Sequence, residues 1–198
     1  NGSSAIEVAA KMSFHYWHNQ GKQQKRRFIT LENSYHGETL GALALGNVEL
    51  YKQIYQPLLM DVITAPSPDC FHREAGETWE QYSARMIQPM RKILELHAHE
   101  VCAVIIEPLV QCAGNMRMYH PIYLNLTGGY LPLSVVLTHE DVYAAFYDEY
   151  TNLRAFLHSH SYTGNPLACT AALATLDIFA TEPVIEDNKK LSAQFFQK

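Results

Sequence analysis

Small residues at the start of a predicted helix are the first feature that could bind a ligand. Gly2, Ser3, Ser4 and Ala5 precede a run of apolar residues at helical spacing. Backbone N–H groups at a helix start lack partners and the helix dipole is positive there, so Gly2 and Ser3 could bind a phosphate. An ordinary serine N-cap explains the same residues, and on this feature alone it is the favoured interpretation.

Two further candidates follow predicted strands. Tyr35 begins the loop sequence Tyr35-His36-Gly37, where an aromatic ring could stack on a planar ligand or fill a corner of the fold. From these residues alone the second interpretation is favoured. Glu107 ends the most apolar predicted strand, and ligands of open α/β sheets bind at the carboxyl ends of strands. A structural salt bridge would explain Glu107 equally well.

A segment rich in histidine and serine is the last candidate. His158, Ser159, His160 and Ser161 place two imidazoles two residues apart, but no third ligand is evident by spacing, so no metal is predicted. We favour a loop whose hydroxyl groups bind an anion, because Gly-Asn-Pro at residues 164–166 begins the next predicted helix. The sequence has no P-loop, GxGxxG or Ser-His-Asp order, so those enzyme classes lack support.

The composition is that of an ordinary globular protein. The 198 residues are 47% hydrophobic and 18% charged, and a formal net charge of −5 gives no reason to expect a nucleic-acid partner. The four cysteines show no metal-finger spacing, which predicts reduced thiols in a cytoplasmic protein. No apolar stretch is long enough for a membrane span, and no signal peptide is visible, although the chain does not begin with methionine.

Helical and strand patterns alternate along the chain, which predicts an α/β fold. Residues 4–18 are expected to form a largely buried helix, and residues 79–97 an amphipathic helix that is kinked or restarted at Pro89. The continuous apolar run at 101–106 predicts a strand buried on both faces. The other predicted elements are strands at 27–31, 60–64 and 133–137 and helices at 38–45 and 165–180.

Several of these segments, in this order, resemble the class III aminotransferases, which depend on pyridoxal 5'-phosphate (PLP). The strings that carry the resemblance are NGSSAIEVAAK, SYHGETLGALAL, VIIEPLVQCAGNMRMYHPIYL, LTGGYLPLSVVLT and HSHSYTGNPLACTAALATLDIF. The resemblance implies the large domain of the fold-type I PLP enzymes, with a mostly parallel sheet flanked by helices. MRMYHPIYL together with HSYTGNPLAC is most like the biotin-pathway members. These move an amino group from S-adenosylmethionine to 7-keto-8-aminopelargonate.

The resemblance also implies roles for individual residues. Gly2 and Ser3 match the turn that holds the PLP phosphate, and Tyr35 matches the aromatic that stacks on the pyridoxal ring and faces the substrate. Glu107 matches the buried carboxylate beneath the cofactor.

Three more positions match a segment that reaches a neighbouring subunit, which implies a homodimer. Ser159 would face the substrate, and His160 and Ser161 the cofactor. Relatives commonly carry Gly and Pro at the first two positions and Thr at the third, so only the hydroxyl of Ser161 is kept.

The sequence departs from the family at one junction, near residues 124–126. After the HPIYL string the family continues through a strand ending in Asp-Glu, a GFGRTG loop and Ser-Lys-Gly before LTGG, whereas here Leu124-Asn125 runs directly into Leu126. The pyridine-binding Asp and the Schiff-base lysine are therefore missing, and no catalytic residue can be assigned. We interpret residues 1–198 as a PLP-binding large domain with an internal gap and with the small domain largely absent.

Three interpretations of this departure remain open. Removing central strands from a parallel sheet would expose apolar faces and unpaired edges, so a natural deletion should fold poorly. We therefore favour a longer parent enzyme of which this sequence is an incomplete record. The alternatives are a catalytically dead truncated fragment and a class III transaminase that uses another amino donor.

Overall fold

The computed structural model describes residues 1–123, 136–158 and 166–195. The chain divides into two compact units. Within the described residues, the first unit runs to His158, and the second contains two helices, α6 (Pro166–Thr181) and α7 (Val184–Phe195). The candidate residues that can be described lie in the first unit, so its architecture decides how they are positioned.

A three-stranded parallel sheet forms the centre of the first unit. Strand β1 (Arg27–Leu31) lies between β2 (Ile63–Ala65) and β3 (Val101–Val104), and both neighbours run parallel to it. In the register, Ile29 of β1 faces Ile63 on one side and Val104 on the other. The predicted strand at 27–31 is confirmed in its bounds. The strand predicted at 60–64 is shorter and shifted to 63–65, and the strand predicted at 101–106 ends at residue 104.

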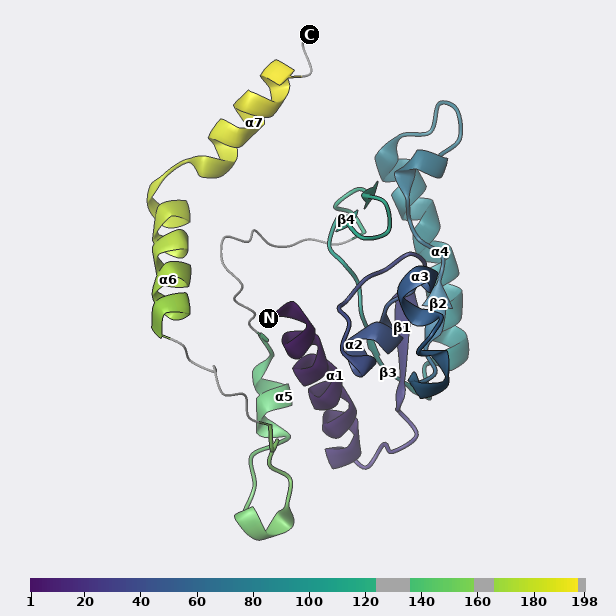
Figure 1. The fold of residues 1–198 in the computed structure, drawn as a ribbon, viewed down its shortest axis with the longest axis vertical. Coiled ribbons are helices and arrows are strands. Elements are labelled where there is room, and N and C mark those ends of the chain that lie inside the picture. The colour runs from purple at the N-terminus through teal and green to yellow at the C-terminus, as the bar shows by residue number, and fades with distance from the viewer. Residues whose placement is uncertain (124–135, 159–165, 196–198) are drawn as a thin grey trace. The chain divides into compact units, whose positions relative to one another are not determined.

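Helices cover both faces of this sheet (Figure 1). On one face, Phe28 packs with residues of α1 (Gly2–Asn19) and α2 (Leu40–Leu45). On the other, Ile29 and Leu31 pack with α4 (Trp79–His97). Successive β1 side chains point to opposite faces, as the period of a strand requires. The predicted α/β architecture of a parallel sheet flanked by helices is therefore confirmed.

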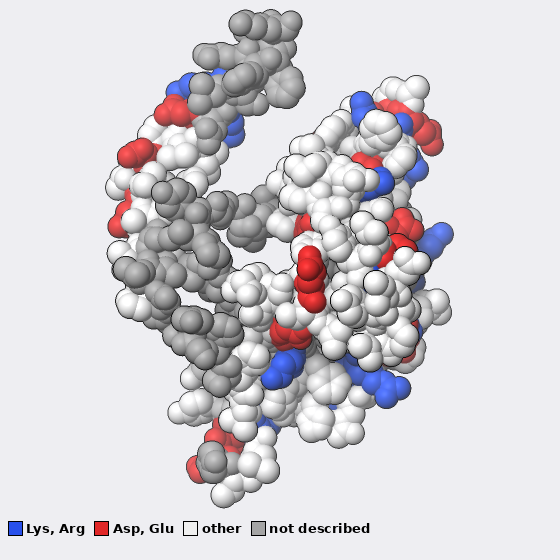
Figure 2. Space-filling model, viewed as in Figure 1, with Lys and Arg blue, Asp and Glu red and all other residues white. Residues whose placement is uncertain are grey.

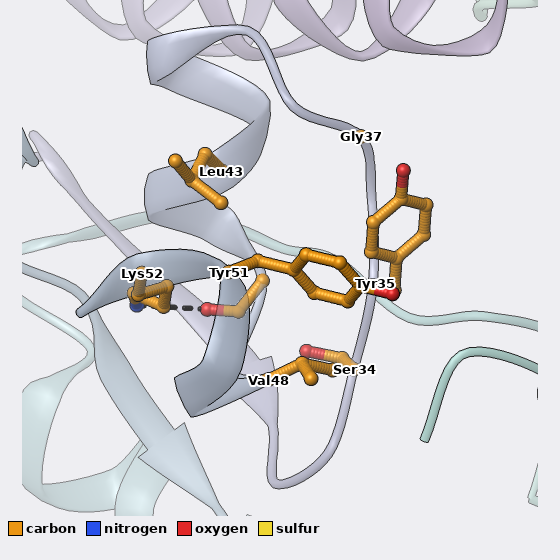
Figure 3. Close-up of a pocket in the computed structure, with 8 residues that line it drawn as sticks. Ser34, Tyr35, Gly37, Leu43, Val48, Tyr51 and Lys52 are labelled. Carbon is orange, nitrogen blue, oxygen red and sulfur yellow. Dashed lines mark hydrogen bonds between the residues drawn. The ribbon is translucent and has the colours of Figure 1, made fainter. Parts of the chain in front are cut away.

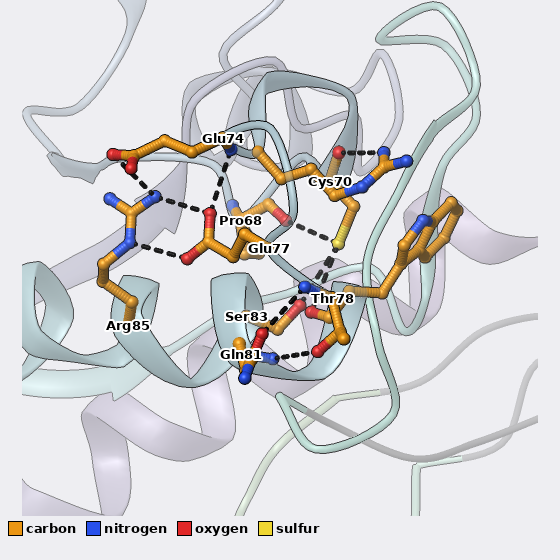
Figure 4. Close-up of polar contacts among 10 residues, drawn as sticks. Pro68, Cys70, Glu74, Glu77, Thr78, Gln81, Ser83 and Arg85 are labelled. Carbon is orange, nitrogen blue, oxygen red and sulfur yellow. Dashed lines mark hydrogen bonds and ion pairs between the residues drawn. The ribbon is translucent and has the colours of Figure 1, made fainter.

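Helix α4 is continuous through Pro89, so of the two predicted alternatives the restart is wrong and the kink stays a prediction. A capping box holds its start: the Thr78 hydroxyl accepts from the Gln81 N–H and the Gln81 side chain accepts from the Thr78 N–H, both near 3 Å. Arg85 adds ion pairs to Glu77 and Glu74 (Figure 4). With its start fixed and its apolar stripe packed on the sheet, the helix tolerates one interior proline.

Two burial predictions are wrong. No residue of α1 is fully buried, because only one stripe of the helix contacts the sheet, and Phe14 is 44% exposed. Strand β3 was expected to be buried on both faces, yet Val104 is 40% exposed. The reason is topological: β3 lies at the edge of the described sheet rather than in its centre.

Several short elements connect the larger ones. They are helices α3 (Glu49–Lys52) and α5 (Glu140–Ala144), the antiparallel pair β4 (Val110–Gln111) and β5 (Arg117–Met118), and 3₁₀ turns at Gln56–Leu58, Cys70–His72 and Tyr150–Asn152. The predicted strand at 133–137 and the junction at 124–126 lie largely outside the described residues.

Basic and acidic side chains intermingle on the molecular surface (Figure 2). In the part of the chain that the structure describes, no helix is both long and apolar enough to cross a membrane.

Candidate cofactor site

The start of α1 carries backbone N–H groups that lack partners within the helix. Asn1 is the N-cap, and its side-chain oxygen accepts from the Ser4 N–H at 3.0 Å. The Ala5 N–H bonds to the Asn1 carbonyl. A helix leaves its first N–H groups without intrahelical partners, so those of Gly2 and Ser3 remain as donors for an anion. A Cβ added at Gly2 would meet nothing within 4 Å. The serine N-cap interpretation is wrong, because Asn1 takes that role.

The loop that follows β1 contacts this helix start directly. Gly37 has a φ of 123°, a conformation that residues with a side chain rarely adopt. A Cβ at Gly37 would lie 2.1 Å from the Ser3 Oγ. Only glycine therefore lets the loop approach α1 this closely. The Tyr35-His36-Gly37 loop and the Gly2–Ser3 turn, separate in the sequence, are neighbours in the structure.

Tyr35 is half-buried in this loop and is held at both ends. Its hydroxyl donates to the Glu38 Oε1 at 2.9 Å, and its backbone N–H donates to the Glu107 Oε2 at 2.9 Å. Its ring lies 5.5 Å from the Tyr51 ring, tilted by 58° (Figure 3). Burial, followed by the hydrogen bond to the Glu38 carboxylate, raises the pKa of Tyr35, so the phenol keeps its proton at neutral pH.

A shallow surface depression lies beside Tyr35. The residues that line it are Ser34, Tyr35, Gly37, Leu43, Gly46, Val48, Tyr51 and Lys52. Figure 3 shows Tyr51 of α3 directed toward the loop that carries Tyr35. The pocket therefore has two aromatic walls.

Glu107 lies just beyond the carboxyl end of β3, and backbone donors hold its side chain. One carboxylate oxygen accepts from the Tyr35 N–H and the other from the Cys112 N–H at 3.2 Å. Burial raises the pKa of Glu107, against the opposing effect of these two N–H donors. Its partners among the described residues are amides rather than a cation. Glu107 thus fixes the backbone at Tyr35, as a residue supporting a cofactor site would.

Two buried basic side chains lie close to the loop. His36 is buried with its Nε2 3.4 Å from the Thr30 Oγ1, and burial lowers its pKa to about 4. Lys52 is the last residue of α3. Its helix packs back on α2, so that its Nζ is buried and donates to the carbonyls of Ala44 and Gly46 at 3.2 and 2.9 Å. Burial lowers the pKa of Lys52.

The predicted residues Ser159, His160 and Ser161 lie outside the described residues. The residue before them, His158, can be placed. Its Nδ1 is 3.0 Å from the Lys11 Nζ on α1, and its ring stacks on that of Phe156.

Sequence reasoning missed three residues that the structure adds to the site: Glu7, Glu38 and Tyr51. Glu38 follows Tyr35 by three residues, a spacing that could have suggested a partner. Glu7 bonds to residues more than thirty positions away, and Tyr51 meets Tyr35 only because α3 folds back. No local signal could have predicted those two contacts.

Comparison with known proteins identifies the family. The profile described as Aminotransferase class-III matches residues 1–126 and 125–198. The chain belongs to the class III aminotransferases. Its most similar relatives include the adenosylmethionine-8-amino-7-oxononanoate aminotransferase of Helicobacter pylori, which is 41% identical over 244 residues, covering 99% of this chain and 54% of the relative. The enzyme of the same name from Geobacter sulfurreducens is 34% identical, covering 93% and 51%.

Solved structures agree on the fold. The crystal structure of the enzyme of that name from Methanocaldococcus jannaschii aligns with a TM-score of 0.80 at 30% identity, covering 94% of this chain and 51% of that one. An amine transaminase from an uncultivated Pseudomonas species, in its PLP-bound form, also aligns at 0.80, with 26% identity and coverages of 98% and 54%. The predicted PLP-transferase fold is confirmed. This class III chain spans about half the length of the relatives it matches.

Proposed function

We propose that this chain is part of a PLP-dependent transaminase that moves an amino group from S-adenosylmethionine to 7-keto-8-aminopelargonate in biotin biosynthesis. The observation that carries the proposal is the meeting of the Gly2–Ser3 helix start with the Tyr35 loop, across the contact of Ser3 with Gly37. Relatives that bear the name adenosylmethionine-8-amino-7-oxononanoate aminotransferase supply the substrates.

The described residues fit PLP. A helix N-terminus with available N–H groups can bind a phosphate. The aromatic ring of Tyr35, in the loop that contacts this helix start, can stack on a planar pyridine ring. PLP, when bound, supplies an electron sink for the amino transfer. In this proposal Gly2 and Ser3 bind the phosphate, Tyr35 covers the ring, and Glu107 holds Tyr35 in place through its backbone N–H.

The phenol of Tyr35 has a second task in the proposal. The Glu38 carboxylate accepts the phenol's hydrogen bond and so fixes the orientation of the hydroxyl, which is proposed to face the substrate. Ser159 is proposed to face the substrate, and His160 and Ser161 the cofactor of a neighbouring subunit. The active protein is accordingly proposed to be a cytoplasmic homodimer.

We further propose that the sequence is an incomplete record of its parent enzyme, missing a segment near residues 124–126. Two observations support this. The family profile matches in two pieces that meet at 125–126, and the alignment to the Helicobacter pylori relative runs over 244 residues although this chain has 198. Val104 is exposed at the open edge of β3, where a further strand would cover it. The missing segment would carry the family's cofactor-bearing lysine.

A half-transamination assay tests the proposed function. The purified natural protein, loaded with PLP, is mixed with S-adenosylmethionine or with ornithine, and the change in PLP absorbance is followed. Conversion by S-adenosylmethionine is expected. Conversion by ornithine alone would favour another donor, and no conversion by either, with an intact mass of 22.5 kDa, would favour a catalytically dead fragment.

A further inference from the structure

A carboxylate of α1 caps the start of α2. The Glu7 Oε1 accepts three hydrogen bonds, from the Thr39 hydroxyl at 2.6 Å, the Gly41 N–H at 2.9 Å and the Ala42 N–H at 3.2 Å. Thr39 is the N-cap residue of α2 but makes no side-chain capping bond of its own to that helix. Glu7 therefore satisfies donors that α2 leaves unpaired, with the added strength of a charged acceptor.

Two glycines allow α1 to lie close to this part of the chain. A Cβ at Gly41 would be 2.3 Å from the Glu7 Oε2, just as one at Gly37 would be 2.1 Å from the Ser3 Oγ. Ser3 and Glu7 are four residues apart and share one face of α1. Gly37 and Gly41 have the same spacing in their own segment. The two segments therefore make two close contacts: Ser3 meets Gly37 at the start of α1, and Glu7 meets Gly41 one helical turn further along.

We propose that Glu7 is a positioning residue for the cofactor site, which sets the separation between the Gly2–Ser3 turn and the Tyr35 ring. This inference rests on the proposed function. Glu7 belongs to the phosphate-binding helix, and its three donors lie in the segment that continues from the Tyr35 loop. Its carboxylate thus forms a polar link between the phosphate-binding helix and the segment that continues from the ring-covering loop.

The physical effect of this link is preorganisation. A ligand that carries both a phosphate and a ring gains from both contacts only if their separation is fixed before binding. Without Glu7, the start of α2 has unpaired N–H groups and can shift along α1. A bound ligand could then not place both its phosphate and its ring at their optimal distances from the protein at the same time. A ligand that lacks the phosphate would not meet this conflict.

The test uses pyridoxamine 5'-phosphate (PMP), which needs no lysine for binding, and pyridoxamine, which lacks the phosphate. Both are titrated by fluorescence into the natural protein freed of bound cofactor, and the ratio of the pyridoxamine Kd to the PMP Kd measures how much the phosphate contributes to affinity. We expect Glu7→Ala to lower this ratio about tenfold, the equivalent of one charge-assisted hydrogen-bond network. Glu7→Gln, which keeps an acceptor oxygen, and Thr39→Ala, which removes one donor, should each lower it less.

Ser13→Ala is the matched control, because Ser13 lies on α1 and its hydroxyl donates to the Ala9 carbonyl of its own helix. Its ratio should equal that of the wild type. An unchanged ratio in folded Glu7→Ala, even with a lower Tm, would overturn the positioning role. If Glu7→Ala does not fold, unchanged ratios in both Glu7→Gln and Thr39→Ala overturn it. A wild-type chain that binds PMP no better than pyridoxamine would instead refute the proposed function.

Discussion

Acidification should weaken the fold through His36, the buried histidine beside Tyr35. Its side chain is 8% exposed, and burial lowers its pKa from an ordinary value of 6.5 to about 4. Between these two values the unfolded chain binds a proton that the folded chain does not. The free energy of unfolding must therefore fall as the pH falls from 6.5 to 4, and the full contribution is present only above 6.5.

The size of this effect follows from the pKa difference. One pKa unit corresponds to about 1.4 kcal/mol, so protonating a buried His36 costs about 3 kcal/mol once the pH is below 4. At pH 5 the loss relative to pH 7.5 is about 2 kcal/mol. That is a large share of the stability of a domain of this size. The loop that presents Tyr35 should be among the first regions to loosen.

Denaturant unfolding followed by tryptophan fluorescence measures this effect, because Trp17 and Trp79 both lie in the first unit. His36→Gln removes the titration, so its unfolding free energy should fall by about 2 kcal/mol less than that of the wild type between pH 7.5 and 5. Carboxylates titrate in both proteins and cancel in the comparison. His99→Gln, at an exposed histidine, is the control and should follow the wild type. Parallel pH curves for the wild type and His36→Gln would refute the reasoning.

Three further predictions concern the site and its surroundings. Tyr35→Ala should weaken PMP binding about tenfold by removing the ring. Tyr35→Phe, which loses the hydrogen bond to Glu38 but keeps the ring, should weaken it less. Equal losses of affinity in a binding titration would contradict stacking of Tyr35 on the PMP ring. Gly37→Ala should destabilise the fold by about 3 kcal/mol through backbone strain and the clash with Ser3. Gly76→Ala, whose added Cβ would meet nothing within 4 Å, should destabilise it by about 1 kcal/mol. Similar denaturation midpoints for the two variants would argue against the close contact. Arg117→Leu should cost about 3 kcal/mol because it removes the guanidinium that pairs with the buried Asp69 carboxylate, which then keeps the Phe71 N–H and the exposed His72 ring as its neighbours. Arg85→Leu, which breaks a half-exposed pair with Glu77, should cost less; a reversed order in urea unfolding would refute this ranking.

The sequence predicted those helices and strands that depend on residues close to one another in the chain. The apolar run at 27–31 predicted β1 with its bounds, and apolar spacing predicted α4 from Trp79 to His97. The small residues at Gly2 and Ser3 preceded a predicted helix, and α1 begins at Gly2. Each of these depends on neighbours within a few residues. The resemblance to a family added the grouping of Tyr35 with Glu107, which spacing alone could not supply.

Tertiary contacts account for what the sequence did not reveal. Lys52 is buried because α3 folds back onto α2, although its own neighbours are polar or exposed. Glu7 looks like an ordinary charged residue on a helix until α2 is placed against it. The half-exposed Val104 depends on which strand occupies the sheet edge. In each case the deciding partner is distant in the sequence, so periodicity carries no information about it.

The most direct test of the central claim is a titration of the wild-type natural protein, freed of bound cofactor, with PMP and with pyridoxamine. The claim is that the Gly2–Ser3 helix start and the Tyr35 ring form one site for a phosphate-bearing pyridine. It predicts that PMP binds at least about tenfold more tightly than pyridoxamine, and that inorganic phosphate competes with PMP but not with pyridoxamine. Equal affinities, or no effect of phosphate, would contradict it.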